Sequence, residues 1–172
     1  NINVTLKTNN KRDYSVYIHE NILHKFNHYF DFIKTGTKIV IFYDKETKKY
    51  AEIIEHSLKK TDYTIYTFKV PTGEQTKSWD TVKLILDDLF ELNIERKDSL
   101  IAVGGGVIGD LIGFVGSIYL RGISIIQVPT TLLAQVDASI GGKTGVNHKK
   151  GKNLIGSFHQ PKMVFIDIQT LH

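Results

Sequence analysis

Hydrophobic positions along the chain follow two alternating patterns. Five short apolar runs have the length and residue content of buried parallel strands, at 38–44, 63–70, 99–104, 124–129 and 163–168. Between them, segments 45–60, 78–92 and 106–120 place apolar residues at helical spacing. A short helix is expected at 20–30 and a helical turn or short helix at 130–139. Alternating strands and helices predict βαβ units and one parallel sheet.

The spacing also predicts which helix positions face the core. In 45–60 the stripe is Tyr50, Ile53, Ile54 and Leu58, and in 78–92 it is Trp79, Val82, Leu86, Leu89 and Phe90. Ser78 is the expected N-cap of the second helix. At the N-terminus, 3–8 and 14–19 alternate as strands around a turn-like 9–13, which predicts a β-hairpin. The predicted fold class is therefore α/β, a Rossmann-like parallel sheet flanked by helices with an N-terminal β-hairpin, and residues 1–172 form one domain.

Composition narrows the classes of function. The 172 residues contain no cysteine, which excludes disulfides and thiolate metal sites and fits a cytoplasmic protein. Seven histidines form no H-E-x-x-H pattern, so no metal ligands are predicted. The net charge of +4 fits nucleic acid, an anionic substrate or only a mildly basic surface. Residues 99–120 are largely apolar, but Asp110 and six glycines argue against a membrane span.

A glycine-rich corner is the first candidate site. Gly104, Gly106 and Gly109 satisfy G-x-G-x-x-G between a predicted strand and a predicted helix, the context of a dinucleotide phosphate site. A standard Rossmann unit has an acid about 20 residues further on, and "ISIIQVPTT" contains none. Close helix–strand packing, with Gly109, Gly113 and Ser117 as a small-residue stripe, therefore stays an alternative. Asp110, in the first helical turn, could accept a ligand hydroxyl.

A second cluster, Asp137 to Gly156, combines glycines with lysines. Converging backbone amides and ammonium groups are typical of anion sites, and a solvated basic loop is the alternative. A P-loop is excluded, because Asp137 occupies the position of its first glycine. No Phe, Trp or Tyr lies between Leu120 and Gly156, so base stacking on nucleic acid has no aromatic platform there.

Four motifs in this order resemble the 3-dehydroquinate synthase family: "PTGEQTKS" at 71–78, "GGGVIGDLIGFVGSIYLRG" at 104–122, "QVPTTLLAQVDASIGGKTGVN" at 127–147 and "GKNLIGSFHQP" at 151–161. The resemblance runs from about residue 40 to the last residue and is densest over 98–167. It implies conversion of 3-deoxy-arabino-heptulosonate 7-phosphate to 3-dehydroquinate and phosphate, in the shikimate pathway of aromatic amino acid biosynthesis.

The resemblance also implies cofactors and partners. Family members use NAD+ catalytically and a divalent metal, zinc or cobalt, whose ligands lie in a helical C-terminal domain that this chain does not contain. The expectation is a truncated chain, an N-terminal half that binds NAD+ and has no turnover alone. The full-length enzyme is expected to be a cytoplasmic homodimer that acts on a small sugar phosphate, with no nucleic acid or membrane partner.

Site residues carry over from the motifs. The expected cofactor contacts are Asp44, Glu74, Lys77, Gly105, Gly106, Val107, Asp110, Thr130, Thr131, Leu133, Asp137, Lys143, Lys152, Thr170, Leu171 and His172. Gly105 to Val107 would face the pyrophosphate, and Thr130, Thr131 and Leu133 the nicotinamide side. The expected catalytic group, where cofactor meets substrate, is Asp137, Lys143, Lys152, Asn153 and Arg121. Arg121 would reach substrate phosphate across a dimer interface.

Two alternatives stay open. Another sugar phosphate cyclase or an iron-type polyol dehydrogenase would share the glycine corner and its aspartate. From a different class, a non-catalytic nucleotide or nucleic-acid binding module would use the same positive charge. NAD protection against heat, compared with salt-sensitive DNA retention, separates an NAD enzyme from the second alternative.

Overall fold

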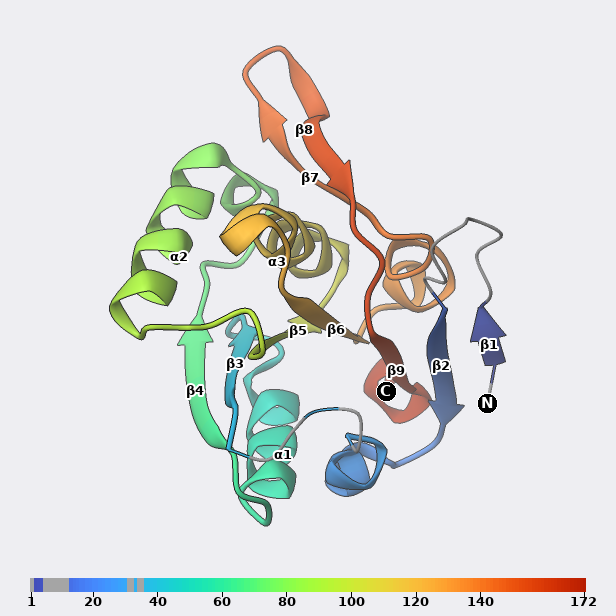
Figure 1. Ribbon diagram of the computed structural model, residues 1–172. Coiled ribbons are helices and arrows are strands. Elements are labelled where there is room, and N and C mark those ends of the chain that lie inside the picture. The colour runs from blue at the N-terminus through green and yellow to red at the C-terminus, as the bar shows by residue number, and fades with distance from the viewer. Residues whose placement is uncertain (1, 5–12, 31–32, 34–35) are drawn as a thin grey trace.

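The computed structural model describes residues 2–4, 13–30, 33 and 36–172. Its main sheet has seven strands in the order β1-β2-β9-β6-β5-β3-β4 (Figure 1). β1 pairs antiparallel with β2, and every other neighbouring pair is parallel, as the sequence predicts. The strands of this sheet are β1 (Ile2–Val4), β2 (Tyr14–His19), β3 (Lys38–Tyr43), β4 (Thr64–Lys69), β5 (Ser99–Gly104), β6 (Ser124–Pro129) and β9 (Met163–Asp167). Residues 5–8 of the predicted first strand and residues 9–12 of the predicted turn lie outside the described residues.

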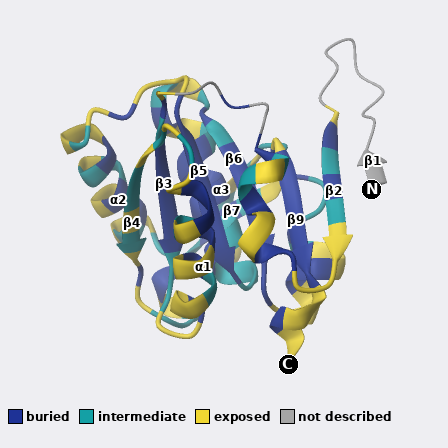
Figure 2. Cartoon of the chain, turned by 90° about the horizontal axis from the view of Figure 1, so that it is seen from below, coloured by how far each residue is buried: buried dark blue, intermediate teal, exposed yellow. Residues whose placement is uncertain are grey.

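Helices cover both faces of this sheet. α1 (Lys48–Leu58) and the 3₁₀ helix η1 (Leu23–Tyr29) pack on one face, and α2 (Trp79–Glu91) and α3 (Gly106–Ile118) pack on the other (Figure 1). Short helical segments follow β4, β6 and β9: η2 (Glu74–Thr76), the π-helix η4 (Ala134–Ala138) and η5 (Ile168–Leu171). Another, η3 (Tyr119–Arg121), follows α3 directly. The central strands are dark blue in Figure 2 because helices bury them on both sides. Within the described part of the chain, no helix combines the length and the apolar character that crossing a membrane requires.

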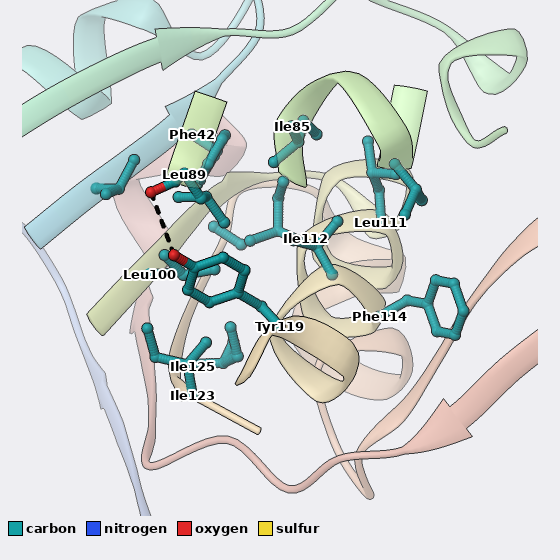
Figure 3. Packing of buried hydrophobic residues seen from close by; sticks show 14 of the residues in the cluster. Phe42, Ile85, Leu89, Leu100, Leu111, Ile112, Phe114, Tyr119, Ile123 and Ile125 are labelled. Carbon is teal, nitrogen blue, oxygen red and sulfur yellow. Dashed lines mark hydrogen bonds between the residues drawn. The ribbon is translucent and has the colours of Figure 1, made fainter. Parts of the chain in front are cut away.

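Alternate side chains of the central strands enter two cores. Ile39, Ile41 and Ile101 face α1, while Val40 and Leu100 face α2 and α3. In the core that α2 and α3 cover, the Tyr119 ring is buried (Figure 3). Its hydroxyl donates to the carbonyls of Leu89 and Ile94 at 3.2 and 2.8 Å. A buried tyrosine thus satisfies its polar end where the chain leaves α2 and α3.

The helix positions that face the core differ in part from the predicted stripes. In α2, Ile85 is buried, whereas Trp79 and Phe90 are 50% and 56% exposed. Both aromatic rings lie on the flank of the helix and lean over neighbours, Trp79 on Phe114 and Phe90 on Tyr119. In α1, Ala51 is buried and Ile53 is 40% exposed. Ser78 caps α2 as predicted, since its Oγ accepts from the Thr81 amide at 3.2 Å.

Part of the region predicted as a glycine- and lysine-rich loop is a β-hairpin. β7 (Lys143–His148) and β8 (Gly151–Phe158) pair antiparallel and project from the side of the sheet that carries α2 and α3 (Figure 1). The loop interpretation was wrong because the paired strands carry glycines where their backbones come closest. A Cβ on Gly156 would collide with the Thr144 carbonyl oxygen. Glycines weaken the strand signal in sequence while permitting this approach.

Candidate active site

The carboxyl ends of the parallel strands carry the segments that the motifs identify. Asp44 follows β3, Gly105 follows β5, Thr130 follows β6 and η5 follows β9. The strand order reverses between β3 and β5, because β4 lies on one side of β3 and β5 on the other. Ligands of open α/β sheets bind at such a switch point, beyond the carboxyl ends of the strands. The fold therefore places the glycine corner at this binding edge.

The glycines from Gly105 to Gly113 pack α3 closely against its neighbours, which is one of the two interpretations that the sequence left open. Gly105 is the N-cap of α3, and a Cβ on Gly106 would lie 3.3 Å from Ala138 Cβ, so the first turn sits directly against η4. Further along α3, a Cβ on Gly109 would lie 2.8 Å from Gln127 Oε1, and one on Gly113 would press on Thr144. The later glycines therefore pack α3 against β6 and β7. The other interpretation, a phosphate site at the first turn, stays a prediction.

A cleft of about 760 Å³ opens where α3 begins. Its walls are the first turn of α3, η4, the β7–β8 hairpin and the 74–77 segment. Among the predicted site residues, those lining it are Glu74, Lys77, Gly106, Val107, Asp110, Leu133, Asp137, Lys143, Lys152 and Asn153. This volume lies within the range of small-molecule and cofactor sites. The cleft joins both sequence clusters into one site.

A buried ion pair lies in this cleft. Lys77 Nζ is 2.5 Å from Asp110 Oδ2, with side chains 5% and 19% exposed. Burial raises the pKa of the Asp110 carboxyl above its ordinary value, and the nearby Glu74 carboxylate acts in the same direction. The ammonium groups of Lys77 and Lys143 oppose that rise. The aspartate is thus held in one orientation at the start of α3.

Glu74 is the second acid of the cleft wall. Its Oε1 accepts from Asn147 Nδ2 at 2.7 Å and lies 3.9 Å from Lys152 Nζ. The backbone N–H of Asn147 donates to the Lys77 carbonyl at 2.8 Å, so β7 is hydrogen-bonded to the 74–77 segment. Carboxylates and ammonium groups alternate across this wall, which suits a ligand that has both hydroxyl groups and negative charge.

Other predicted residues lie at the same edge of the sheet without lining the cleft. Asp44 Oδ1 accepts from the Thr47 amide and hydroxyl, and Thr47 Oγ1 also donates to the Val103 carbonyl, which links the ends of β3 and β5. Thr170 is buried, and its hydroxyl oxygen accepts a hydrogen bond from Gln135 Nε2 at 3.0 Å. Gly105, Thr130, Thr131, Leu171 and His172 also lie along this edge.

Arg121 lies apart from the cleft. It is exposed in η3, beyond the last residue of α3, and the 13 residues of that helix span roughly 20 Å. Leu120 and Arg121 both have positive φ, 48° and 64°. The geometry of this chain does not bring Arg121 to the other predicted catalytic residues, and its contact with substrate phosphate stays a prediction.

Sequence reasoning missed several cleft residues because it missed the hairpin. Thr144, Leu154, Ser157 and Phe158 line the cleft from β7 and β8. The quoted motifs contain all four, so the strand pairing is the information that was lacking. Asn147 was not among the predicted site residues, although its side chain links Glu74 to the hairpin.

The residues of the cleft fit a dinucleotide and do not fit a metal ion. The first amides of α3 have no helical acceptor and are available to a diphosphate. A side chain at Gly105 or Gly106 would crowd that turn, since a Cβ there would lie 3.2 or 3.3 Å from Thr131 or Ala138. Among the described residues, no group of three His, Asp or Glu side chains could hold a metal ion.

A parallel sheet with its glycine corner at the switch point and a charged cleft beside it defines an α/β domain of the Rossmann-like class. Comparison with known proteins narrows this class. The family "3-dehydroquinate synthase N-terminal" matches residues 67–172. The 3-dehydroquinate synthase of Rippkaea orientalis is 46% identical over 159 residues, which cover 92% of this chain and 43% of that protein. The chain belongs to the 3-dehydroquinate synthase family and spans less than half the length of this relative.

Solved structures agree with this assignment. A 2-deoxy-scyllo-inosose synthase complexed with carbaglucose-6-phosphate, NAD+ and Co2+ superimposes with a TM-score of 0.83 and 28% identity, over 93% of this chain and 43% of that one. The 2-epi-5-epi-valiolone synthase of Streptomyces hygroscopicus, with NAD+ and Zn2+ bound, gives a TM-score of 0.80 and 29% identity, over 94% and 45%. The predicted family and fold class are confirmed.

Proposed function

We propose that this chain is the NAD+-binding part of a 3-dehydroquinate synthase. The complete enzyme would convert 3-deoxy-arabino-heptulosonate 7-phosphate to 3-dehydroquinate and phosphate. The observation that carries the proposal is the cleft itself, in which the open first turn of α3 and the Lys77–Asp110 pair share one wall. Family membership and the NAD+ bound by the two structural neighbours support the choice of ligand.

The residues of this chain have distinct roles in the proposal. The α3 amides from Gly106 onward bind the diphosphate, where the helix dipole favours negative charge. Asp110, oriented by Lys77, accepts a hydrogen bond from the cofactor. Lys143 and Lys152, which are exposed in the cleft, hold the anionic ends of the substrate. Bound NAD+ supplies a reversible hydride acceptor for a ring hydroxyl.

Several parts of the activity would come from outside this chain. The described residues offer no ligand set for the divalent metal that neighbouring structures contain. The relatives are more than twice as long as the matched region. We therefore assign the metal site and the remaining substrate contacts to the complete cytoplasmic enzyme. We also assign to it the homodimer in which Arg121 would reach the substrate phosphate across the interface. The chain alone is expected to release no phosphate from the substrate.

Calorimetric titration of the 172-residue chain with NAD+ tests the proposal. Saturable binding is expected, and Gly106→Val and Asp110→Ala should each weaken it by about tenfold or more, which corresponds to about 1.4 kcal/mol. Lys83→Gln, an exposed change on α2 away from the cleft, should leave the affinity unchanged. A chain that is folded by circular dichroism and binds no NAD+ would overturn the proposal.

A further inference from the structure

The pairing of β7 with β8 is irregular beside the cleft. Val146 pairs with Ile155 and His148 pairs with Gly151, so one residue of β7, Asn147, stands opposite three residues of β8. Those three are Lys152, Asn153 and Leu154, and all of them line the cleft. Extra residues bend a strand and re-aim its side chains. The irregularity is therefore what turns this part of β8 toward the cleft.

Asn147 fills the centre of this irregularity with its side chain. Its Oδ1 accepts from the Asn153 amide at 2.9 Å, and its Nδ2 donates to Glu74 Oε1 at 2.7 Å. Asn153 has φ +56°, a left-handed conformation that is uncommon outside glycine. The amide group of Asn147 thus supports the unusual backbone at Asn153 from one side and fixes the carboxylate of Glu74 on the other.

We infer that Asn147 is a positioning residue, which holds the β8 bulge and Glu74 so that Lys152 and Asn153 face the cleft. Asn147 does not itself line the cleft and acts through these three neighbours. The inference rests on the proposed function in one respect, since it assumes that the cleft takes NAD+. An amide is required because the side chain must accept from a backbone N–H and donate to a carboxylate at once.

The first test separates local geometry from ligand binding. In Asn147→Ala, amide exchange at Asn153 should become about tenfold faster by NMR, because its acceptor is lost. NAD+ affinity should fall by about fivefold or more, the size of a typical lost hydrogen bond. Exchange and affinity that both match the wild type, or faster exchange with unchanged affinity, would overturn the inference.

A matched control shows whether lost stability alone explains the result. Asn93→Ala removes an asparagine that has positive φ, 52°, just beyond α2 and away from the cleft, so it disturbs the fold without touching Asn153 or Glu74. It should lower the midpoint of thermal unfolding while leaving NAD+ affinity unchanged. If Asn93→Ala weakened NAD+ binding as much as Asn147→Ala, the role of Asn147 would be merely structural and the inference would fail.

A swap of donor and acceptor gives the sharper test. Asn147→Asp alone places two carboxylates at hydrogen-bond distance and should be the worst variant. Adding Glu74→Gln restores the pair, because the side-chain amide at position 74 then donates to the carboxylate at position 147. The amide exchange of Asn153 and the NAD+ affinity should therefore return to the values of Glu74→Gln alone. No rescue would overturn the inference. If the wild-type chain binds no NAD+, the proposed function fails, and Asn153 exchange in these variants still decides the role of Asn147.

Discussion

Lys77 Nζ and Asp110 Oδ2 lie 2.5 Å apart, and the lysine side chain is almost fully buried. The pair joins the segment after β4 to Asp110, 33 residues further along the chain. Asp110 is the fifth residue of α3, so the prediction that it lies in the first turn was wrong by about one residue. Breaking a buried pair leaves one charge without compensation, which typically costs more than the pair contributes. The cleft therefore depends on both residues being present together.

Replacing the lysine should destabilise the fold and the site. Lys77→Met is expected to lower the free energy of unfolding by about 3 kcal/mol near neutral pH, because the Asp110 carboxylate then lacks a counter-charge. The loss should shrink at acidic pH, where Asp110 becomes neutral. Urea unfolding at both pH values measures it, with the exposed Lys83→Met as the control. A loss that is equal at both pH values would contradict the explanation.

Asp110 should make stability depend on pH in a defined direction. Burial raises the pKa of this carboxyl in the folded chain, so above the ordinary aspartate value the folded state keeps a proton that the unfolded state has lost. The free energy of unfolding should therefore fall as pH rises through this window and level off above the raised pKa.

Comparison with Asp110→Asn isolates this effect. Urea unfolding of both proteins from about pH 4 to about pH 7 should show a stability difference, wild type minus variant, that declines with pH. A difference that grows with pH would mean that the Lys77 charge outweighs burial and lowers the pKa of Asp110.

The sequence predicted the central fold closely, for a physical reason. Residues 99–104 and 124–129 match β5 and β6 residue for residue, because strands buried on both faces are uninterrupted apolar runs. The amphipathic helices were placed within a few residues, but half-exposed Trp79 and Phe90 show that large aromatic side chains can cover a core from its flank. The hydrophobicity of a residue does not tell whether its side chain enters the core or covers the core from the flank of the helix.

For the candidate site, the sequence predicted many of the residues that line the cleft but not the shape of the cleft. Motif residues from 74 to 153 meet in one cleft, because those that follow β4, β5 and β6 lie at one edge of the main sheet and the β7–β8 hairpin brings Lys143, Lys152 and Asn153 to them. The β7–β8 hairpin was not predicted, because Gly145 and Gly156 carry no strand preference and take part through close backbone approach. The role of Asn147 depends on a mismatch of register between two strands, which no single-residue pattern encodes.

Close approach at Gly156 leads to a third prediction. A Cβ there would collide with the Thr144 carbonyl oxygen, a backbone atom that cannot rotate away. Gly156→Ala should therefore separate β7 from β8 locally, with amide exchange about tenfold faster in both strands and unchanged in β5.

Gly151→Ala is the matched control in the same hairpin. A Cβ at Gly151 would approach only the Leu154 side chain, at 3.2 Å, and that side chain can rotate. Its exchange pattern should resemble the wild type. Equal effects of the two variants would show that the hairpin is sensitive to any alanine and that the backbone collision is not the cause.

Asp167 connects two parts of the binding edge from a buried position. Its carboxylate accepts from the amides of Asn21, Ile22 and Leu23 at 2.7, 2.8 and 3.1 Å, at the start of η1. It also accepts from the Gln169 amide at 3.1 Å, which caps η5, the segment that contains the predicted cofactor contacts Thr170 and Leu171.

Removing this acceptor should affect both stability and the site. Asp167→Ala leaves several amides without a partner, and the expected loss of unfolding free energy is about 3 kcal/mol in urea titrations. Asp167→Asn keeps one acceptor oxygen and should lose about half as much, whereas the exposed Asp87→Ala should change little. NAD+ affinity should be highest in Asp87→Ala, lower in Asp167→Asn and lowest in Asp167→Ala, because η5 loses its N-cap in the last variant. A loss below about 1 kcal/mol for Asp167→Ala would mean that water replaces the carboxylate, and that η5 does not depend on it.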